Sequence, residues 1–261
     1  EYLKYLDGLT YEQLDQASMR RFRSAQIVVH IIEPQTPDEV KYDIFGRVNT
    51  LGSPLSTQEI RHAMSRTRSR DFLRELTELD VFDEATARNF FRRDPENAGN
   101  WMRDTGRMMN RELALRFCAF LDFDVDEYKQ FPSLDAYLAD FTKRIDNRSA
   151  SKPAFSDEAL HEMKVKFTAA MLSASLVLGK FAFRRTPSQA SKRGPINRAV
   201  FEAQSTALAK FQSLVLQTRQ AQVKQKLLDL LREDEYVRSI TVGTGDPRRV
   251  LYRLSRTQEA I

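Results

Sequence analysis

The spacing of apolar residues predicts helices over most of the chain. Between residues 157 and 183 apolar side chains recur every three or four positions, which is typical of a helix with one buried face. From about Arg103 onward nearly every segment has this spacing. Further helices are expected at 10–24, 36–47, 71–79, 84–91, 133–147, 196–216, 219–236 and 248–259, with a loop at 94–100. The pattern therefore favours a mainly α protein.

One segment has a different pattern. The residues from Ile27 to Ile32 are all β-branched and apolar except His30, and this run ends at Glu33-Pro34. Such a run predicts a strand that is buried on both faces. A lone strand leaves its backbone groups unpaired. We therefore expect its partner strands upstream of Glu1 or in another chain.

A turn between two expected helices carries polar residues of interest. Arg47 and Asn49 lie where the first helix ends, and the turn follows at residues 50–54. Ser56 and Glu59 have the spacing of a capping box, which predicts the start of the next helix. An arginine, an amide and unpaired backbone N–H groups can together bind an anion. The same residue types also cap helix ends, so both interpretations stay open.

Composition limits the class of protein. The 261 residues are 41% hydrophobic, with only nine glycines and nine prolines, which favours helices over a β-sandwich. Cys118 is the single cysteine, so no internal disulfide can form, and we expect a reducing, cytoplasmic location. The apolar stretch at 167–183 contains Lys180 and is too short to span a bilayer, so no membrane partner is expected.

Two groups of basic residues are candidates for binding DNA. The net charge is +5, which is compatible with a polyanionic partner but does not require one. The densest basic run contains Arg61, Arg66, Arg68 and Arg70. A second group surrounds the polar loop at 187–195 and contains Arg184, Arg185, Lys192 and Arg193. Their charges could hold a nucleic-acid backbone or form solvated surfaces paired with nearby acids.

Other motifs do not indicate a metal or a catalytic centre. The three histidines lie far apart, and none has a second ligand at metal-binding spacing. The acidic run at 122–126 lacks the later glycine and glutamate of a calcium loop. Trp101 follows a loop, and we expect it to pack that loop against the protein.

The region of the turn resembles a known family. The residues IFGRVNTLGSPLSTQEIRHAM resemble the F-x-R-x-N…G-x-x-L-x-x-Q-E-I-R block of the GmrSD-type restriction family, whose N-terminal domain is ParB/sulfiredoxin-like. RRFRSAQIVVHIIEP resembles the strand before that block, and RELALRFCAFL and GPINRAVFEA resemble the family's helical half. The family's upstream D-G-Q-Q-R motif, linked to nucleotide hydrolysis, is not present in this chain. We therefore expect a fragment or the product of a split gene.

The resemblance implies a domain organisation. Residues 1–95 would be the C-terminal part of a ParB/sulfiredoxin-like domain, and residues 96–261 would be a helical bundle domain. The expected fold class is mainly α: a helical bundle with a single N-terminal strand left over from the α+β domain.

The resemblance also implies a function. The chain would belong to a modified-DNA restriction or anti-phage defence system, contributing nucleotide sensing and DNA engagement without catalysis in this fragment. The nucleotide contacts would be Arg47, Asn49, Gln58 and Arg61, and the two basic groups would face DNA. NTP and magnesium are expected only in full-length relatives.

Two alternatives remain at this point. The chain could be a helical interaction module that docks a nuclease subunit or a second copy of itself, because an unpaired strand invites pairing across chains. It could also be part of an NTP-hydrolysing subunit whose catalytic motif lies upstream of Glu1.

Overall fold

A computed structural model describes residues 4–33, 35–48, 54–185, 193–211 and 213–261. The fold is mainly α, as the sequence predicts. The chain divides into two compact units, Glu1–Val48 and Asn49–Ile261. The boundary expected between residues 95 and 96 falls inside the second unit, because helices on both sides of it contribute to one hydrophobic core.

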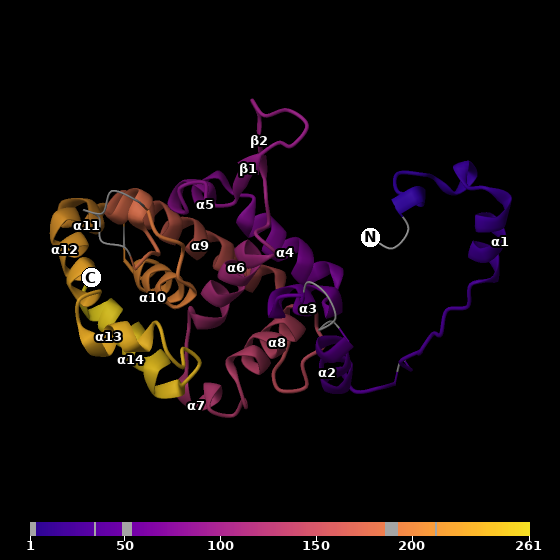
Figure 1. The fold of residues 1–261 in the computed structure, drawn as a ribbon. Coiled ribbons are helices and arrows are strands. Elements are labelled where there is room, and N and C mark those ends of the chain that lie inside the picture. The colour runs from indigo at the N-terminus through magenta and orange to yellow at the C-terminus, as the bar shows by residue number, and fades with distance from the viewer. Residues whose placement is uncertain (1–3, 34, 49–53, 186–192, 212) are drawn as a thin grey trace. The chain divides into compact units, whose positions relative to one another are not determined.

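The first unit contains the 3₁₀ helices Lys4–Leu6 and Tyr11–Gln13 and the helices α1 (Gln16–Ser24) and α2 (Asp38–Val48) (Figure 1). Residues 25–33 form no strand, and the side chains of Ile27, Val28, Val29 and Ile31 are 71–85% exposed. The prediction of a buried strand at 27–32 is therefore wrong. β-Branched residues favour extended backbone, but a strand also needs a hydrogen-bonded partner, and the described residues supply none here.

The second unit consists mainly of helices. They are α3 (Thr57–Met64), α4 (Thr67–Thr77), α5 (Asp80–Ala85), α6 (Met109–Phe120), α7 (Val125–Tyr128), α8 (Leu134–Ile145), α9 (Asp157–Leu178), α10 (Arg198–Leu208), α11 (Ser213–Thr218), α12 (Gln220–Leu230), α13 (Asp234–Ser239) and α14 (Pro247–Glu259). The capping box predicted at the start of α3 is confirmed. The Ser56 hydroxyl accepts the Glu59 N–H, and the Glu59 carboxylate accepts the Ser56 N–H.

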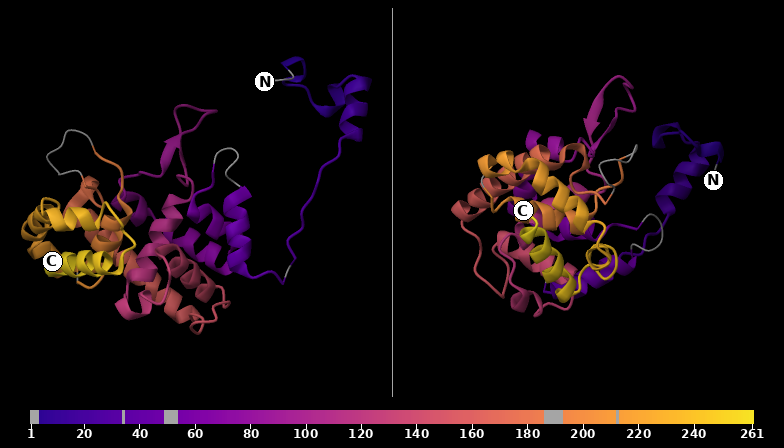
Figure 2. Two further views of the ribbon diagram at one scale, coloured as in Figure 1. Left: turned by 60° about the horizontal axis from the view of Figure 1, so that its bottom comes forward. Right: turned by 90° about the vertical axis from the view of Figure 1, so that its left-hand side faces the viewer.

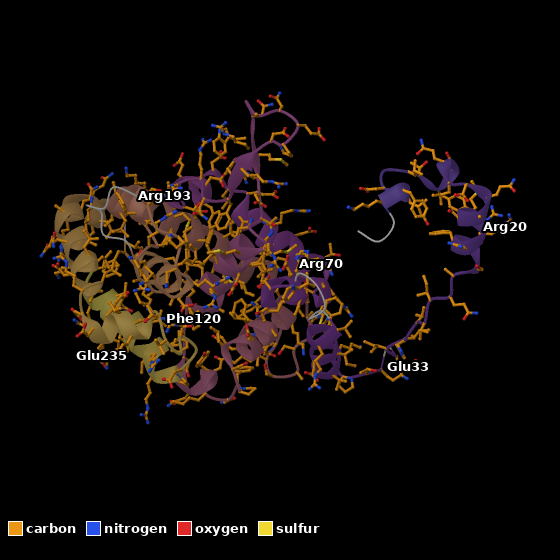
Figure 3. The ribbon with its side chains drawn as sticks, viewed as in Figure 1. Arg20, Glu33, Arg70, Phe120, Arg193 and Glu235 are labelled. Carbon is orange, nitrogen blue, oxygen red and sulfur yellow. The ribbon has the colours of Figure 1, made fainter. Side chains whose placement is uncertain are left out.

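Helix α9 is central to the packing of this unit (Figures 1 and 2). It packs against α5, α10, α11 and α12, while α10 also packs against α6 and α14. Phe167, Ala170, Met171 and Ala174 have three- to four-residue spacing on α9 and are fully buried, as that spacing predicts. In Figure 3 Phe120 lies among the helices, whereas Glu235 lies at the surface.

A short antiparallel hairpin lies between α5 and α6. Strand β1 (Phe91–Arg93) pairs with strand β2 (Trp101–Arg103), with Phe91 opposite Arg103 and Arg93 opposite Trp101. The ribbon extends away from the helices of this unit (Figure 1). The sequence predicts its loop at 94–100 but not its strands, because three residues are too few to show a strand period.

Candidate functional site

Of the four residues predicted to contact a nucleotide, one lies in the first unit, two lie in the second unit and one lies outside the described residues. Arg47 lies on α2 in the first unit, where its side chain is 79% exposed and its Nε is 2.9 Å from a carboxylate oxygen of Asp43. Asn49 and residues 50–53 lie outside the described residues. Gln58 and Arg61 lie on α3 in the second unit, and both are buried.

Arg61 is held inside the protein. Its Nε donates to Oε1 of Gln58 at 2.9 Å, and its Nη1 donates to Oδ1 of Asp135 at 2.8 Å. The side chain is 1% exposed. A guanidinium at this depth cannot reach a DNA phosphate, which corrects the DNA-contacting role predicted for it. Its face of α3 packs toward α6 and α8, a tertiary contact that the sequence of α3 does not reveal.

The other arginines of the first basic group have different environments. Arg68 donates to two backbone carbonyls and pairs with Asp157. Arg70 donates to the carbonyls of His62 and Ala63, which caps the C-terminal end of α3. Arg66 is exposed, and its side chain has no partner among the described residues. Arg68 and Arg70 therefore hold structural elements together rather than presenting an open basic surface.

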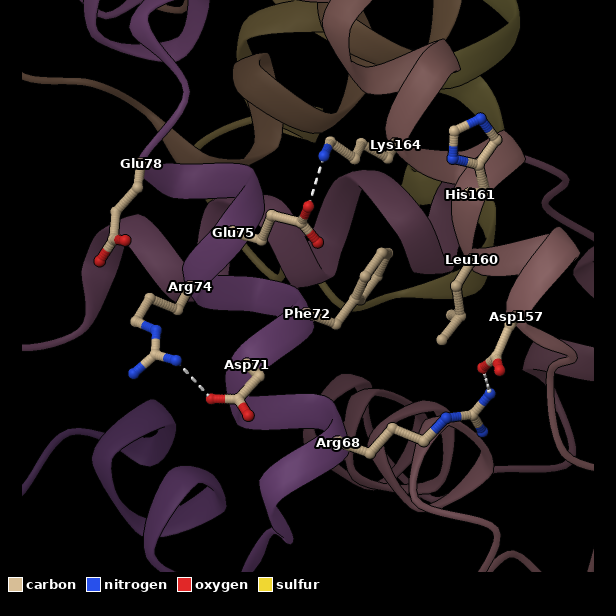
Figure 4. A pocket seen from close by; sticks show the side chains of 10 residues that line it. All are labelled: Arg68, Asp71, Phe72, Arg74, Glu75, Glu78, Asp157, Leu160, His161 and Lys164. Atoms are coloured by element: carbon tan, nitrogen blue, oxygen red, sulfur yellow. Dashed lines mark hydrogen bonds and ion pairs between the residues drawn. The ribbon is translucent and has the colours of Figure 1, made fainter.

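The surface beside Arg68 is a groove of about 670 Å³ between α4 and α9 (Figure 4). Its cations are paired with carboxylates, Arg68 with Asp157, Arg74 with Asp71 and Lys164 with Glu75. Glu78 adds another carboxylate to the wall. A nucleic-acid backbone needs surplus positive charge, and this groove does not supply it.

The second basic group is also divided. Arg184 is 1% exposed and donates to the carbonyls of Thr86, Ala182 and Gly194, so it is not available to DNA. Burial, together with the nearby Arg193, lowers the pKa of Arg184 to about 10. Arg185 and Arg193 are exposed, and Lys192 lies outside the described residues. Only the exposed members of this group can take the predicted role.

A polar cavity of about 760 Å³ lies where three helices begin. The starts of α3, α8 and α10 line it, and α6 and the turn at 240–245 complete its wall. The polar residues of the lining include Ser56, Thr57, Glu112, Arg116, Ser133, Asp135, Asn197, Arg198, Thr241 and Thr244. These side chains come from five separate parts of the chain, which the fold brings together.

The three helix starts provide unpaired backbone donors. Ser56, Ser133 and Asn197 cap their helices by accepting the third amide of each one. The first two amides of each helix donate to no acceptor in the parts of the chain that the structure describes. Helix N-termini carry partial positive charge and accept anions. The cavity wall is therefore electropositive where these helices meet.

A chain of ion pairs runs from this cavity into the core. Arg198 Nε donates to Glu112 at 2.8 Å. Arg116 bridges Glu112 and Glu202, with 2.9 Å hydrogen bonds to each. Arg253 then pairs with Glu202, which is fully buried. These charged residues connect α6, α10 and α14.

Within the network as a whole, positive charges outnumber negative ones. Burial favours a higher pKa for Glu112, but Arg116, Arg198 and Arg61 hold its pKa below the usual value. The carboxylate is therefore ionised and neutralised by its arginine partners. Counting Arg61 and Asp135 with the ion-pair chain, four arginines face three carboxylates. Of these side chains, Arg116, Arg198, Glu112 and Asp135 line the cavity, and their charges sum to zero.

One buried donor near this wall is unsatisfied. Nη2 of Arg61 has no hydrogen-bond partner among the described residues, while Nη1 of the same group holds Asp135 at the cavity. A buried unpaired donor costs about 1–3 kcal/mol. A bound ion or water at this position would give the donor a partner.

Most residues of the cavity have no sequence signal. The exceptions are Ser56, which belongs to the predicted capping box, and the pair Glu112 and Arg116, which have i,i+4 spacing inside the apolar stretch RELALRFCAFL. Charged residues at core positions of a helix are rare unless they are paired, so this spacing indicates a buried ion pair. The partner Glu202 lies far along the chain and cannot be identified from spacing.

The described part of the chain has neither a metal cluster nor a membrane-spanning helix. No group of three or more His, Cys, Asp or Glu side chains in it could hold a metal ion. No helix in those same residues has the length and apolar character needed to cross a bilayer.

The chain was compared with protein-family models, with curated proteins and with solved structures, and none of the three comparisons gave a match.

Proposed function

We propose that this chain binds a phosphate-bearing nucleotide in the cavity formed by the starts of α3, α8 and α10. One observation carries the proposal, namely the convergence of three helix N-termini, with unpaired amides, beside Arg198. Phosphate oxygens accept hydrogen bonds from such amides and from guanidinium groups.

The rest of the wall suits the other parts of a nucleotide. A volume of about 760 Å³ lies within the range of small-molecule sites. Asp135, whose side chain is 55% exposed, offers a carboxylate that can accept a hydrogen bond from a ribose hydroxyl. Leu55, which is 36% exposed, and the half-buried Leu134 provide apolar surface against which a base can pack. The proposed ligand is therefore a nucleotide rather than a free phosphate ion.

The proposed activity is binding and not hydrolysis. Glu112 is the carboxylate beside Arg198 that lines the cavity, and its arginine partners keep its pKa low. A carboxylate stabilised in this way is a weak general base for activating water.

Nucleotide sensing fits the restriction or anti-phage defence role that the resemblance to the GmrSD-type family implies. Engagement of modified DNA within such a system rests on the resemblance alone.

Arg198→Gln is the variant that tests this proposal. Its side chain is 45% exposed, so the substitution should leave the fold intact while removing a charged donor at the cavity. A hydrogen bond to a charged group is worth about 1.5–3 kcal/mol, so nucleotide affinity should fall roughly tenfold or more. Isothermal titration calorimetry with ATP, GTP and pyrophosphate measures the change, and adenosine shows how much binding depends on phosphate.

Arg232→Gln is the matched control. Arg232 is an arginine with a 64% exposed side chain that pairs with Asp229 and does not line the cavity. This variant should bind like the unmodified protein. Equal losses in both variants, adenosine binding as tight as ATP binding, or no binding of any phosphate compound would each contradict the proposal.

A second candidate function is supported by the exposed segment at residues 27–32. Its apolar side chains face solvent, and its backbone groups have no strand partner among the described residues. An extended apolar segment of this kind can add a strand to a second copy of the chain or to a nuclease subunit. Pairing with a second copy is the form of this candidate that can be tested directly.

Val29→Lys should abolish self-association if that second candidate is correct. Val29 is 71% exposed, and a lysine there opposes pairing between apolar strands. Analytical ultracentrifugation over a range of protein concentrations measures the dimer fraction. Val242→Lys, at a valine in the second unit that is 59% exposed, is the control. An unmodified chain that stays monomeric at all concentrations would remove this candidate.

A further inference from the structure

We propose that the β1–β2 hairpin and the residues beside it bind single-stranded nucleic acid. This site is separate from the nucleotide cavity and shares no lining residue with it. The first observation is the exposure of Trp101, which is 61% accessible. The expectation that Trp101 packs its loop down is therefore wrong, and a large aromatic side chain is left available to a ligand.

One face of the hairpin alternates arginine and aromatic side chains. Directly opposed residues of an antiparallel pair lie on the same face, and so do residues two apart along a strand. Phe91 and Arg103 are opposed, and Arg93 and Trp101 are opposed, so all four share one face. The guanidinium carbon of Arg93 lies 5.8 Å from the Trp101 ring centre, and that of Arg103 lies 5.6 Å from the Phe91 ring centre.

This face borders a cavity of about 360 Å³. The cavity is lined by Ala87, Arg88, Asn89, Phe91, Trp101 and Arg193. Asn89 accepts a hydrogen bond from Arg184 with its Oδ1, which leaves its amide nitrogen as a donor for the edge of a base. Arg88, over the Phe91 ring, and Arg193, at the rim, are both exposed. Aromatic, amide and guanidinium groups thus surround one space.

The local charge favours a polyanion. Residues 88–103 contain four arginines against Asp94 and Glu96. Arg103 forms ion pairs with Asp80 and Asp83 of α5. These pairs neutralise its charge and hold the hairpin against α5. Arg88, Arg92 and Arg93 are exposed and have no ion-pair partner among the described residues. Surfaces that bind single strands combine such charges with aromatic rings on which bases stack.

The expected ligand is a single strand because its bases are free to stack. In a duplex the bases are paired and stacked on one another, so they are less available to stack on an exposed tryptophan ring. Trp101 is the only tryptophan of the chain, so its fluorescence reports on this site alone. Stacking of a base on the ring should quench that fluorescence.

The test measures binding of fluorescein-labelled oligothymidylate to the full chain at low salt by fluorescence anisotropy. Trp101→Ala should weaken binding about tenfold, which lies within the range that stacking of one base contributes. Trp101→Phe keeps an aromatic ring and should restore most of the affinity. Met102→Ala is the matched control, since Met102 is 39% exposed and lies on the opposite face of the same strand. Thermal melting should be unchanged in all three variants.

Further arms of the experiment separate the ligand classes. The duplex of oligothymidylate with oligoadenylate should bind more weakly than the single strand, and oligouridylate shows whether RNA or DNA is preferred. Arg198→Gln should bind the strand normally, so failure of the nucleotide cavity would not affect this result. Equal binding by Trp101→Ala and Met102→Ala, preference for the duplex, or unquenched tryptophan fluorescence in the bound state would overturn the proposal.

Discussion

Replacing Glu202 by glutamine is expected to lower the free energy of unfolding by about 3–5 kcal/mol, the usual cost of removing one partner from a buried ion pair. Glu202 is fully buried and accepts hydrogen bonds from both Arg116 and Arg253. The Arg253 side chain is fully buried and that of Arg116 is 8% exposed. Without the carboxylate, two buried guanidinium groups lose their shared counter-charge.

Chemical denaturation monitored by circular dichroism measures this loss. The midpoint of thermal unfolding should also fall by about 10 °C, given the change expected per kcal/mol for a unit of this size. Glu235→Gln is the matched control, because Glu235 is exposed on α13 and lies at the surface in Figure 3. A similar stability for the two variants would mean that Glu202 does not hold α6, α10 and α14 together.

Phe167→Ala should lower the free energy of unfolding by about 3–5 kcal/mol, as is typical when a buried phenylalanine is truncated. Phe167 is fully buried on α9. Its ring centre lies 5.8 Å from that of Phe82 on α5 and 5.1 Å from that of Phe117 on α6. Truncation would leave a cavity at the point where these three helices meet, and the surrounding helices can relax only partly to fill it.

Val165→Ala provides the comparison on the same helix. Val165 is 54% exposed, so its truncation should change the free energy of unfolding by no more than about 0.5 kcal/mol. The measurement is again denaturant unfolding, with equal slopes showing that the unfolded states are comparable. A small effect at Phe167, or equal effects at both positions, would contradict the central place of α9 in the core.

Local patterns predict the helices well where the pattern and the packing agree. The three- to four-residue spacing of α9 identifies its buried face, because that face meets several neighbouring helices. The capping box of Ser56 and Glu59 identifies the start of α3, because its hydrogen bonds are local. Neither inference needs knowledge of distant parts of the chain.

The segment at 27–32 shows where local patterns fail. Its β-branched residues favour extended backbone, but a strand also requires pairing with another segment, which its own sequence does not specify. Arg61 shows a second kind of failure. An arginine in a basic run is expected at the protein surface. Arg61 is instead buried and donates a hydrogen bond to Asp135, which lies far along the chain. Both outcomes depend on long-range contacts.

The nucleotide cavity could be predicted only in part. The sequence points to the capped start of α3, which does form one wall of the cavity. The starts of α8 and α10 carry ordinary capping residues, Ser133 and Asn197, and nothing local shows that these helix ends converge. Arg198 becomes a candidate ligand contact only once that convergence is known.

A crystal structure of the chain grown with ATP tests the proposed nucleotide site most directly. We predict phosphate density within hydrogen-bonding distance of the first amides of α3, α8 and α10 and of the Arg198 guanidinium. ATP bound elsewhere, with the space between these helix starts unoccupied, would contradict the proposal.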